Sequence, residues 1–190
     1  MDDLEKGLLD GAKKAEASYE NITGGHWLSH APESFIQVVV ALELSRLGHG
    51  AYIDASHKKL HTGIKRGPGR PMKRTGQRPD ISIWDGSGET IRAYVEIKKA
   101  GHAVDLPPSV RKDAKKIEAL LKSPKAAQAG YLLVYIQAST KRKIEPLKER
   151  FERWARVLRT WELAGCVEGK NCEAWVRATG LFRYIGSQAS

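Results

Sequence analysis

Alternation of apolar and polar residues marks one stretch as the centre of the predicted structure. In residues 79–84 and 90–98 apolar side chains recur at every second position, and a Gly-rich turn sequence separates the two runs. This alternation predicts a β-hairpin with one apolar face. Successive strand residues point to opposite faces, so Asp80, Glu96 and Lys98 are expected together on the other face.

Helical spacing, with apolar residues three or four positions apart, appears in four further segments. They cover residues 1–24, 29–48, 109–122 and 145–164. In the second segment the inward residues are expected to be Phe35, Val38, Val39, Leu42 and Leu47. In the fourth they are Leu147, Phe151, Trp154, Leu158 and Trp161, an aromatic stripe typical of a core or a dimer contact. The first helix is expected to pack on the core or on a second subunit.

Strands complete the pattern. Residues 50–55 predict a short strand, and the continuous apolar run at residues 130–137 predicts a strand buried on both faces. Residues 173–177 and 181–185 are expected to form a terminal hairpin that decorates the core. In chain order the central elements read helix, strand, hairpin, helix, strand, which indicates an α/β fold.

The length favours one domain, because 190 residues suffice for a single sizeable core. We divide it into an N-terminal helix at 1–28, a core at 29–137 containing a loop at 56–78, and a C-terminal helix and hairpin at 145–190. No apolar run approaches the roughly 20 residues of a membrane span, and the first residues lack a signal-peptide pattern. A cytoplasmic protein without a membrane partner is expected, with Cys166 and Cys172 as reduced thiols.

Charge favours a polyanionic partner, since the formal net charge is +10. Residues 56–78 contain eight Lys or Arg residues and no acid. Their Gly-Arg-Pro centre resembles an AT-hook, which implies contacts with the DNA minor groove, but a less specific phosphate-binding loop is the favoured interpretation. The loop candidates for DNA contact are Lys65, Arg66, Arg70, Lys73 and Arg74. The basic residues of the helix at 109–122, Lys116 included, are expected mostly to face outward, and Arg111, Lys112 and Lys115 are its candidates. His57 and His61 are not expected to bind metal.

The sequence Pro79-Asp80, followed by Glu96-Ile97-Lys98, resembles the signature of the PD-(D/E)XK nuclease superfamily. The resemblance implies a restriction endonuclease-like fold with an αβββαβ core, a mixed central sheet flanked by helices, and here an extra N-terminal helix and C-terminal hairpin. It also implies a metal site formed by Asp80, Glu96 and the Ile97 carbonyl. The layout is similar to that of archaeal Holliday-junction resolvases, which adds Glu33 at the start of a helix; Glu43 is the substitute candidate.

Two carboxylates beside an ammonium group form an oxygen-rich site of the kind that Mg²⁺ prefers. We therefore expect a Mg²⁺-dependent DNA endonuclease, with Mn²⁺ as a substitute, in which Asp80, Glu96, Lys98 and Glu33 are catalytic. Lys98 would orient water or stabilise charge, and a lowered pKa would also permit general-base work. The expected partner is double-stranded or branched DNA, bound by a homodimer.

Other functions fit the same pattern. A structure-selective resolvase or an exonuclease would use the same four residues. A non-catalytic DNA-binding module, or a protein that binds or cuts RNA, would also suit the charge, although no RNA-recognition motif is visible. Without the nuclease chemistry, Glu96 and Lys98 would form a structural pair on an exposed strand face.

Overall fold

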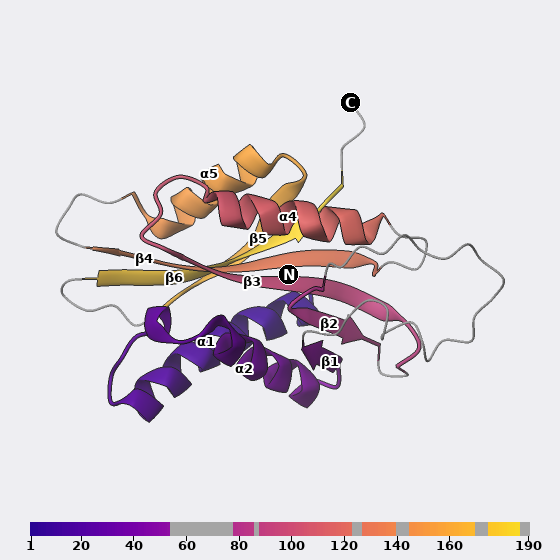
Figure 1. Ribbon diagram of the computed structural model, residues 1–190, viewed down its shortest axis with the longest axis horizontal. Helices are drawn as coiled ribbons and strands as arrows, with labels where there is room; N and C mark the ends of the chain where they lie inside the picture. Colours follow the sequence, from indigo (N-terminus) through magenta and orange to yellow (C-terminus); the bar gives the residue numbers. More distant parts are fainter. Residues whose placement is uncertain (54–77, 86–87, 123–126, 140–144, 170–174, 187–190) are drawn as a thin grey trace.

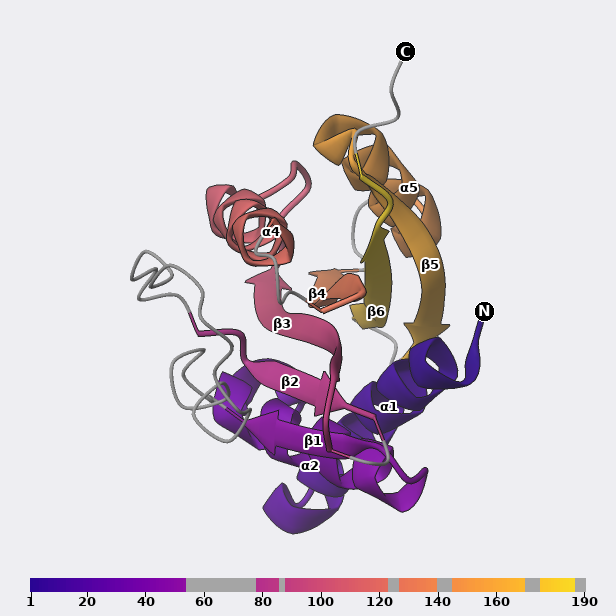
Figure 2. The ribbon, with the colours of Figure 1, turned by 90° about the vertical axis from the view of Figure 1, so that its right-hand side faces the viewer.

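A computed structural model describes residues 1–53, 78–85, 88–122, 127–139, 145–169 and 175–186. Six strands form one mixed sheet in the order β1-β2-β3-β4-β6-β5. The helices α1 (Asp3–Thr23) and α2 (Glu33–Arg46) cover one face, and α4 (Pro108–Leu121) and α5 (Leu147–Leu158) cover the other (Figures 1 and 2). The predicted α/β class, with a mixed sheet between helices, is confirmed.

The sheet combines antiparallel pairs with one parallel pair, and its first three strands begin at one edge. The strands are β1 (Gly50–Ile53), β2 (Ile81–Trp84), β3 (Ile91–Gly101), β4 (Ala129–Ser139), β5 (Trp161–Glu168) and β6 (Trp175–Tyr184). The first three pair in antiparallel fashion, and β4 then pairs in parallel with β3. A parallel pair needs a long connection, and α4 provides it. The predicted hairpin and buried strand are therefore both present.

The hairpin side chains divide between two hydrophobic cores. Ile81, Val95 and Ile97 pack into the core beneath α1 and α2. The opposite face contributes Trp84 and Tyr94 to the core beneath α4 and α5. The expectation of a single apolar face is therefore wrong, because both faces of the hairpin are buried. The alternation still separates the two sets of side chains, and it places Glu96 and Lys98 on the α4 side of the sheet.

The N-terminal helix α1 begins and ends at strong signals. Asp2 caps it by accepting a 2.8 Å hydrogen bond from the Glu5 N–H, and Gly24 ends it in the left-handed conformation at φ 70°. The helix packs on α2, β5 and β6, so of the two expected positions it occupies the one on the core. Among the described helices, none has the length and apolarity that crossing a membrane requires.

The expected inward face of α2 is wrong for three of its five residues: Val38, Leu42 and Leu47 are 46%, 60% and 50% exposed. Phe35 and Val39 are partly buried against the core, as expected. The buried side chains are instead Ile36, Val40, Ala41, Glu43 and Leu44. Apolar residues surround most of this helix, so their spacing does not identify the side that meets α1 and the sheet.

The C-terminal prediction is wrong in two respects. The last helix, α5, ends at Leu158, where Arg159 takes φ 57°, and Trp161 begins β5 instead of continuing the helical stripe. The proposed turn near Gly180 does not exist, because β6 runs unbroken through that residue. The hairpin is the pair β5–β6, and β6 pairs with β4, so it belongs to the central sheet.

Candidate active site

The site lies where β2 begins and β3 continues beyond it. Ile81 pairs with Val95, so Asp80, one residue earlier, lies opposite Glu96. The Asp80 carboxylate accepts a 2.7 Å hydrogen bond from the Ile97 N–H. The two acids of the signature are therefore neighbours on adjacent strands, as the hairpin register predicts.

Glu33, the first residue of α2, joins the same edge of β3. Its Oε1 accepts a 3.0 Å hydrogen bond from the Lys99 N–H. The N–H groups of Ile97 and Lys99 point to the same side of β3, the side on which β2 has not yet begun. Asp80 and Glu33 thus satisfy two strand donors that a longer β2 would otherwise pair. The Lys99 ammonium also binds the carbonyls of Ser29 and Ala31, which fixes the chain leading into α2.

Lys98 connects the strand to both layers of helices. Its Nζ lies 3.2 Å from Glu33 Oε2 and 3.4 Å from Asp113 Oδ2 on α4. Burial lowers the pKa of this ammonium, but Asp113 and Glu33 outweigh burial, and the pKa is raised above its ordinary value. Lys98 is therefore held as a cation, which suits charge stabilisation and opposes the general-base role.

Glu96 is the most buried acid of the site, at 3% exposure, and it pairs with Lys116 of α4 at 2.6 Å. Burial and then the charge of Asp80 raise the pKa of Glu96 to about 8, although Lys116 opposes both. Burial also raises the pKa of Asp80, against the hydrogen bond from Ile97. Two carboxylates thus share a poorly hydrated space that favours additional positive charge.

Two residues of the site, Asp113 and Lys116, were missed by sequence reasoning. Lys116 was expected to point outward with its basic neighbours. Its side chain is only 21% exposed, whereas Arg111, Lys112 and Lys115 are exposed as expected. Asp113 and Lys116 are three residues apart and border the buried stripe of α4, so helical geometry could have indicated that both face the sheet.

The donor atoms are of the right type for a hard divalent cation, since Asp80, Glu96 and Glu33 all offer carboxylate oxygens. A strand residue presents its C=O to the same side as its N–H, so the Ile97 carbonyl faces the same edge. Within the described ranges, however, no three His, Cys, Asp or Glu side chains are gathered as a metal-binding group. Ammonium and amide groups are the present partners of both Glu33 oxygens, of Asp80 Oδ2 and of Glu96 Oε1. A metal ion that binds these oxygens replaces those partners.

The remaining candidates lie elsewhere. Glu43 pairs with Lys14 of α1 and with Arg46, and so takes no part in the group around Lys98. The histidines and basic residues of the long loop lie outside the described residues; these are His57, His61, Lys65, Arg66, Arg70, Lys73 and Arg74.

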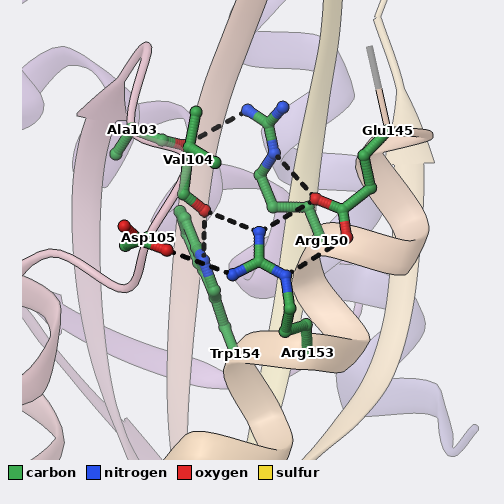
Figure 3. A network of polar contacts seen from close by, with 7 residues as sticks. All are labelled: Ala103, Val104, Asp105, Glu145, Arg150, Arg153 and Trp154. Carbon is green, nitrogen blue, oxygen red and sulfur yellow. Dashed lines mark hydrogen bonds and ion pairs between the residues drawn. The ribbon is translucent and has the colours of Figure 1, made fainter.

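A polar network fixes the loop between β3 and α4, the two elements that supply Lys98 and Asp113 (Figure 3). Arg153 and the Trp154 indole donate to the Val104 carbonyl at 2.9 and 3.0 Å. Buried Arg150 donates to the Ala103 carbonyl at 3.1 Å. Trp154 is fully buried, as expected of a core stripe, and α5 thereby restrains the path from strand to helix.

The sequence matches no protein-family model, and no match was found among curated proteins or among solved structures.

Proposed function

We propose that this protein is a metal-dependent DNA endonuclease of the PD-(D/E)XK superfamily. The observation that carries the proposal is the meeting of Asp80, Glu96 and Lys98 with Glu33, a residue 65 positions from Lys98 in the chain. A structural Glu–Lys pair on a strand requires no such long-range partner. Three acids and a lysine at one partly open strand edge are the groups that metal-assisted phosphodiester hydrolysis uses.

The order of the elements supports the same proposal. Among the described residues from α2 to β4, the elements are a helix, three antiparallel strands, a crossover helix and a strand parallel to the third. This sequence of elements agrees with the αβββαβ core expected from the resemblance. α1, α5 and the β5–β6 hairpin extend that core on both sides (Figure 1).

In the proposed mechanism Asp80, Glu96, Glu33 and the Ile97 carbonyl would hold Mg²⁺, and Mn²⁺ would replace it. The bound metal would supply Lewis-acid activation of water and of the scissile phosphate. Lys98, kept protonated by Glu33 and Asp113, donates hydrogen bonds to the phosphate oxygens on which negative charge develops. Asp113 has no direct contact with substrate in this scheme; it orients Lys98.

DNA contacts come from the basic side of α4. Arg111, Lys112 and Lys115 are exposed, and they lie on the helix that also carries Asp113 and Lys116. The basic segment at residues 56–78 is the second proposed contact. Because phosphate contacts release counterions, DNA affinity should fall steeply with salt. The homodimer that would cut both strands stays a prediction.

The test is nicking and linearisation of supercoiled plasmid with Mg²⁺, Mn²⁺ or EDTA. We expect metal-dependent cleavage by the wild type, and none above background by Asp80→Asn, Lys98→Met or Glu33→Gln. Glu43→Gln is the matched control on the same helix as Glu33, and it should keep wild-type activity because Glu43 contacts Lys14 and not Lys98.

Cleavage that survives EDTA or the loss of Lys98 would contradict the proposal. If the wild type cuts no plasmid, branched and single-stranded DNA test the resolvase and exonuclease alternatives. An RNA substrate tests the alternative that the protein cuts RNA. If the protein binds DNA but cleaves none of these substrates, the proposal of a nuclease is wrong and a non-catalytic DNA-binding module takes its place.

A further inference from the structure

The pair formed by Glu96 and Lys116 is the closest ion pair of the candidate site. Lys116 Nζ lies 2.6 Å from Glu96 Oε1, and the Glu96 side chain is 3% exposed. The pair joins β3 to α4 across the core face of the sheet. An ammonium group at this distance competes with a metal ion for the same carboxylate oxygen.

The charges around the pair are unequal. Three acids, Glu33, Asp113 and Glu96, pair with the two ammonium groups of Lys98 and Lys116, while the fourth, Asp80, accepts a hydrogen bond from the Ile97 N–H. Lys98 lies between Glu33 and Asp113, whereas Lys116 contacts Glu96. Lys116 is therefore the cation that neutralises Glu96, the second acid of the signature.

We propose that Lys116 acts as an internal substitute for the divalent cation, so that it must leave Glu96 before the metal binds and thereby sets the metal affinity of the site. The inference rests on the proposed function, because it assumes that Glu96 is a metal ligand. Lys116 competes with the metal for one oxygen and takes no part in the chemical step.

The side chain can leave Glu96 because it is not enclosed. Lysine has a flexible four-carbon stem, and Lys116 is 21% exposed. Lys112 lies one helical turn before it on the same side of α4 and is exposed, so a displaced ammonium joins the basic surface proposed to contact DNA. Bound phosphate would then favour the displaced position, and DNA and metal would each strengthen binding of the other.

The experiment measures Mn²⁺ binding without DNA, from the electron paramagnetic resonance signal of the free ion at pH 8.0. Lys116→Met is compared with the wild type, with Lys116→Arg and with Lys115→Met. Lys115→Met is the matched control, since it removes the same charge from an exposed neighbouring position. We expect Lys116→Met to bind Mn²⁺ at least about tenfold more tightly than the wild type, from the usual strength of close charge pairs.

The controls separate local competition from general charge. Lys115→Met should change the dissociation constant by no more than about twofold, because exposed charges are screened. Lys116→Arg keeps the competing cation and should not bind more tightly than the wild type. Lys116→Gln repeats the test if the methionine variant does not fold, as judged by circular dichroism.

Equal affinities of Lys116→Met and Lys115→Met would overturn the inference while leaving the metal site intact. Absence of Mn²⁺ binding in every variant would instead overturn the metal site itself, and with it the role of Lys116. Binding by Lys116→Met alone would support the inference in its strongest form, with the lysine excluding the metal until substrate arrives.

Discussion

Two arginines of β6 make ion pairs with α1 at very different depths, and their comparison tests how burial determines the strength of such pairs. Arg177 is 2% exposed and lies 2.9 Å from Glu16 and 3.3 Å from Glu20, with its guanidinium 5.6 Å from the centre of the Trp27 ring. Arg183 lies 2.8 Å from Glu5 and also pairs with Glu162; the arginine is 42% exposed, although the Glu5 side chain is only 1% exposed. Both join the same strand to the same helix, so Arg183 is a matched control.

We expect Arg177→Met to lower the free energy of unfolding by about 3–5 kcal/mol at pH 7.5, because removing one partner leaves a buried charge uncompensated. The stranded group is Glu16, whose side chain is 10% exposed. Arg183→Met should cost less, about 1–2 kcal/mol, because the Arg183 guanidinium is itself exposed and the buried Glu5 that it leaves keeps its hydrogen bond from the Asp2 N–H.

The loss should depend on pH in a defined direction. Burial raises the pKa of Glu16 above its ordinary value of 4.5, although Arg177 lowers it. An acid with a raised pKa in the folded state binds its proton more tightly there, so its contribution to stability is present at low pH and disappears as the pH rises through the folded pKa. Removing Arg177 raises that pKa further. The difference between wild type and Arg177→Met should therefore be smaller at pH 5 than at pH 7.5.

The assay is urea unfolding of the three proteins at both pH values, followed by tryptophan fluorescence and circular dichroism. Adding Glu16→Gln to Arg177→Met should recover part of the lost stability, because the buried charge is then absent. Equal losses in Arg177→Met and Arg183→Met, or a loss from Arg177→Met that grows toward pH 5, would refute the reasoning.

Further predictions concern packing, the site and the thiol. Gly180→Ala should lower the free energy of unfolding by about 1–3 kcal/mol in the same urea assay, because the added Cβ would lie 2.8 Å from the Phe151 ring. Asp113→Asn should slow plasmid cleavage about ten- to a hundredfold with an unchanged circular dichroism spectrum, since Lys98 loses a partner 3.4 Å away. Cys166 is a free thiol, and burial raises its pKa to about 11, so iodoacetamide should label it slowly at pH 8 in the folded protein and quickly in urea, as followed by peptide mass spectrometry.

The part of the site carried by the hairpin was predictable because strand geometry is simple. A period of two places Asp80, Glu96 and Lys98 on one face once the register is even. Helix positions were harder to predict. The sequence groups Lys116 with the solvent-facing basic residues of its helix. Only the packing of α4 on β3 shows that its side chain turns toward Glu96.

The C-terminal errors came from signals with two meanings. The expected strands at 173–177 and 181–185 left Gly180 in the connection between them. Gly180 instead lies in β6 opposite Val134, and its missing side chain makes room for the Phe151 ring. The end of α5 is marked by Arg159 in a conformation that favours glycine, so composition gave no warning. The apolar spacing then continued by coincidence into Trp161 of β5.

The carboxylates of Asp80 and Glu33 also stand in for a missing strand, because they hold the Ile97 and Lys99 amides of β3 at 2.7 and 3.0 Å. Alanine at either position would therefore leave a backbone N–H of β3 without an acceptor. An unpaired strand edge of this kind can fray or pair with another chain. A lost activity would then report damage to the sheet as well as loss of a charge. Asparagine and glutamine keep an oxygen acceptor in place, so at these two positions they separate the chemistry of the acid from its role as a surrogate strand.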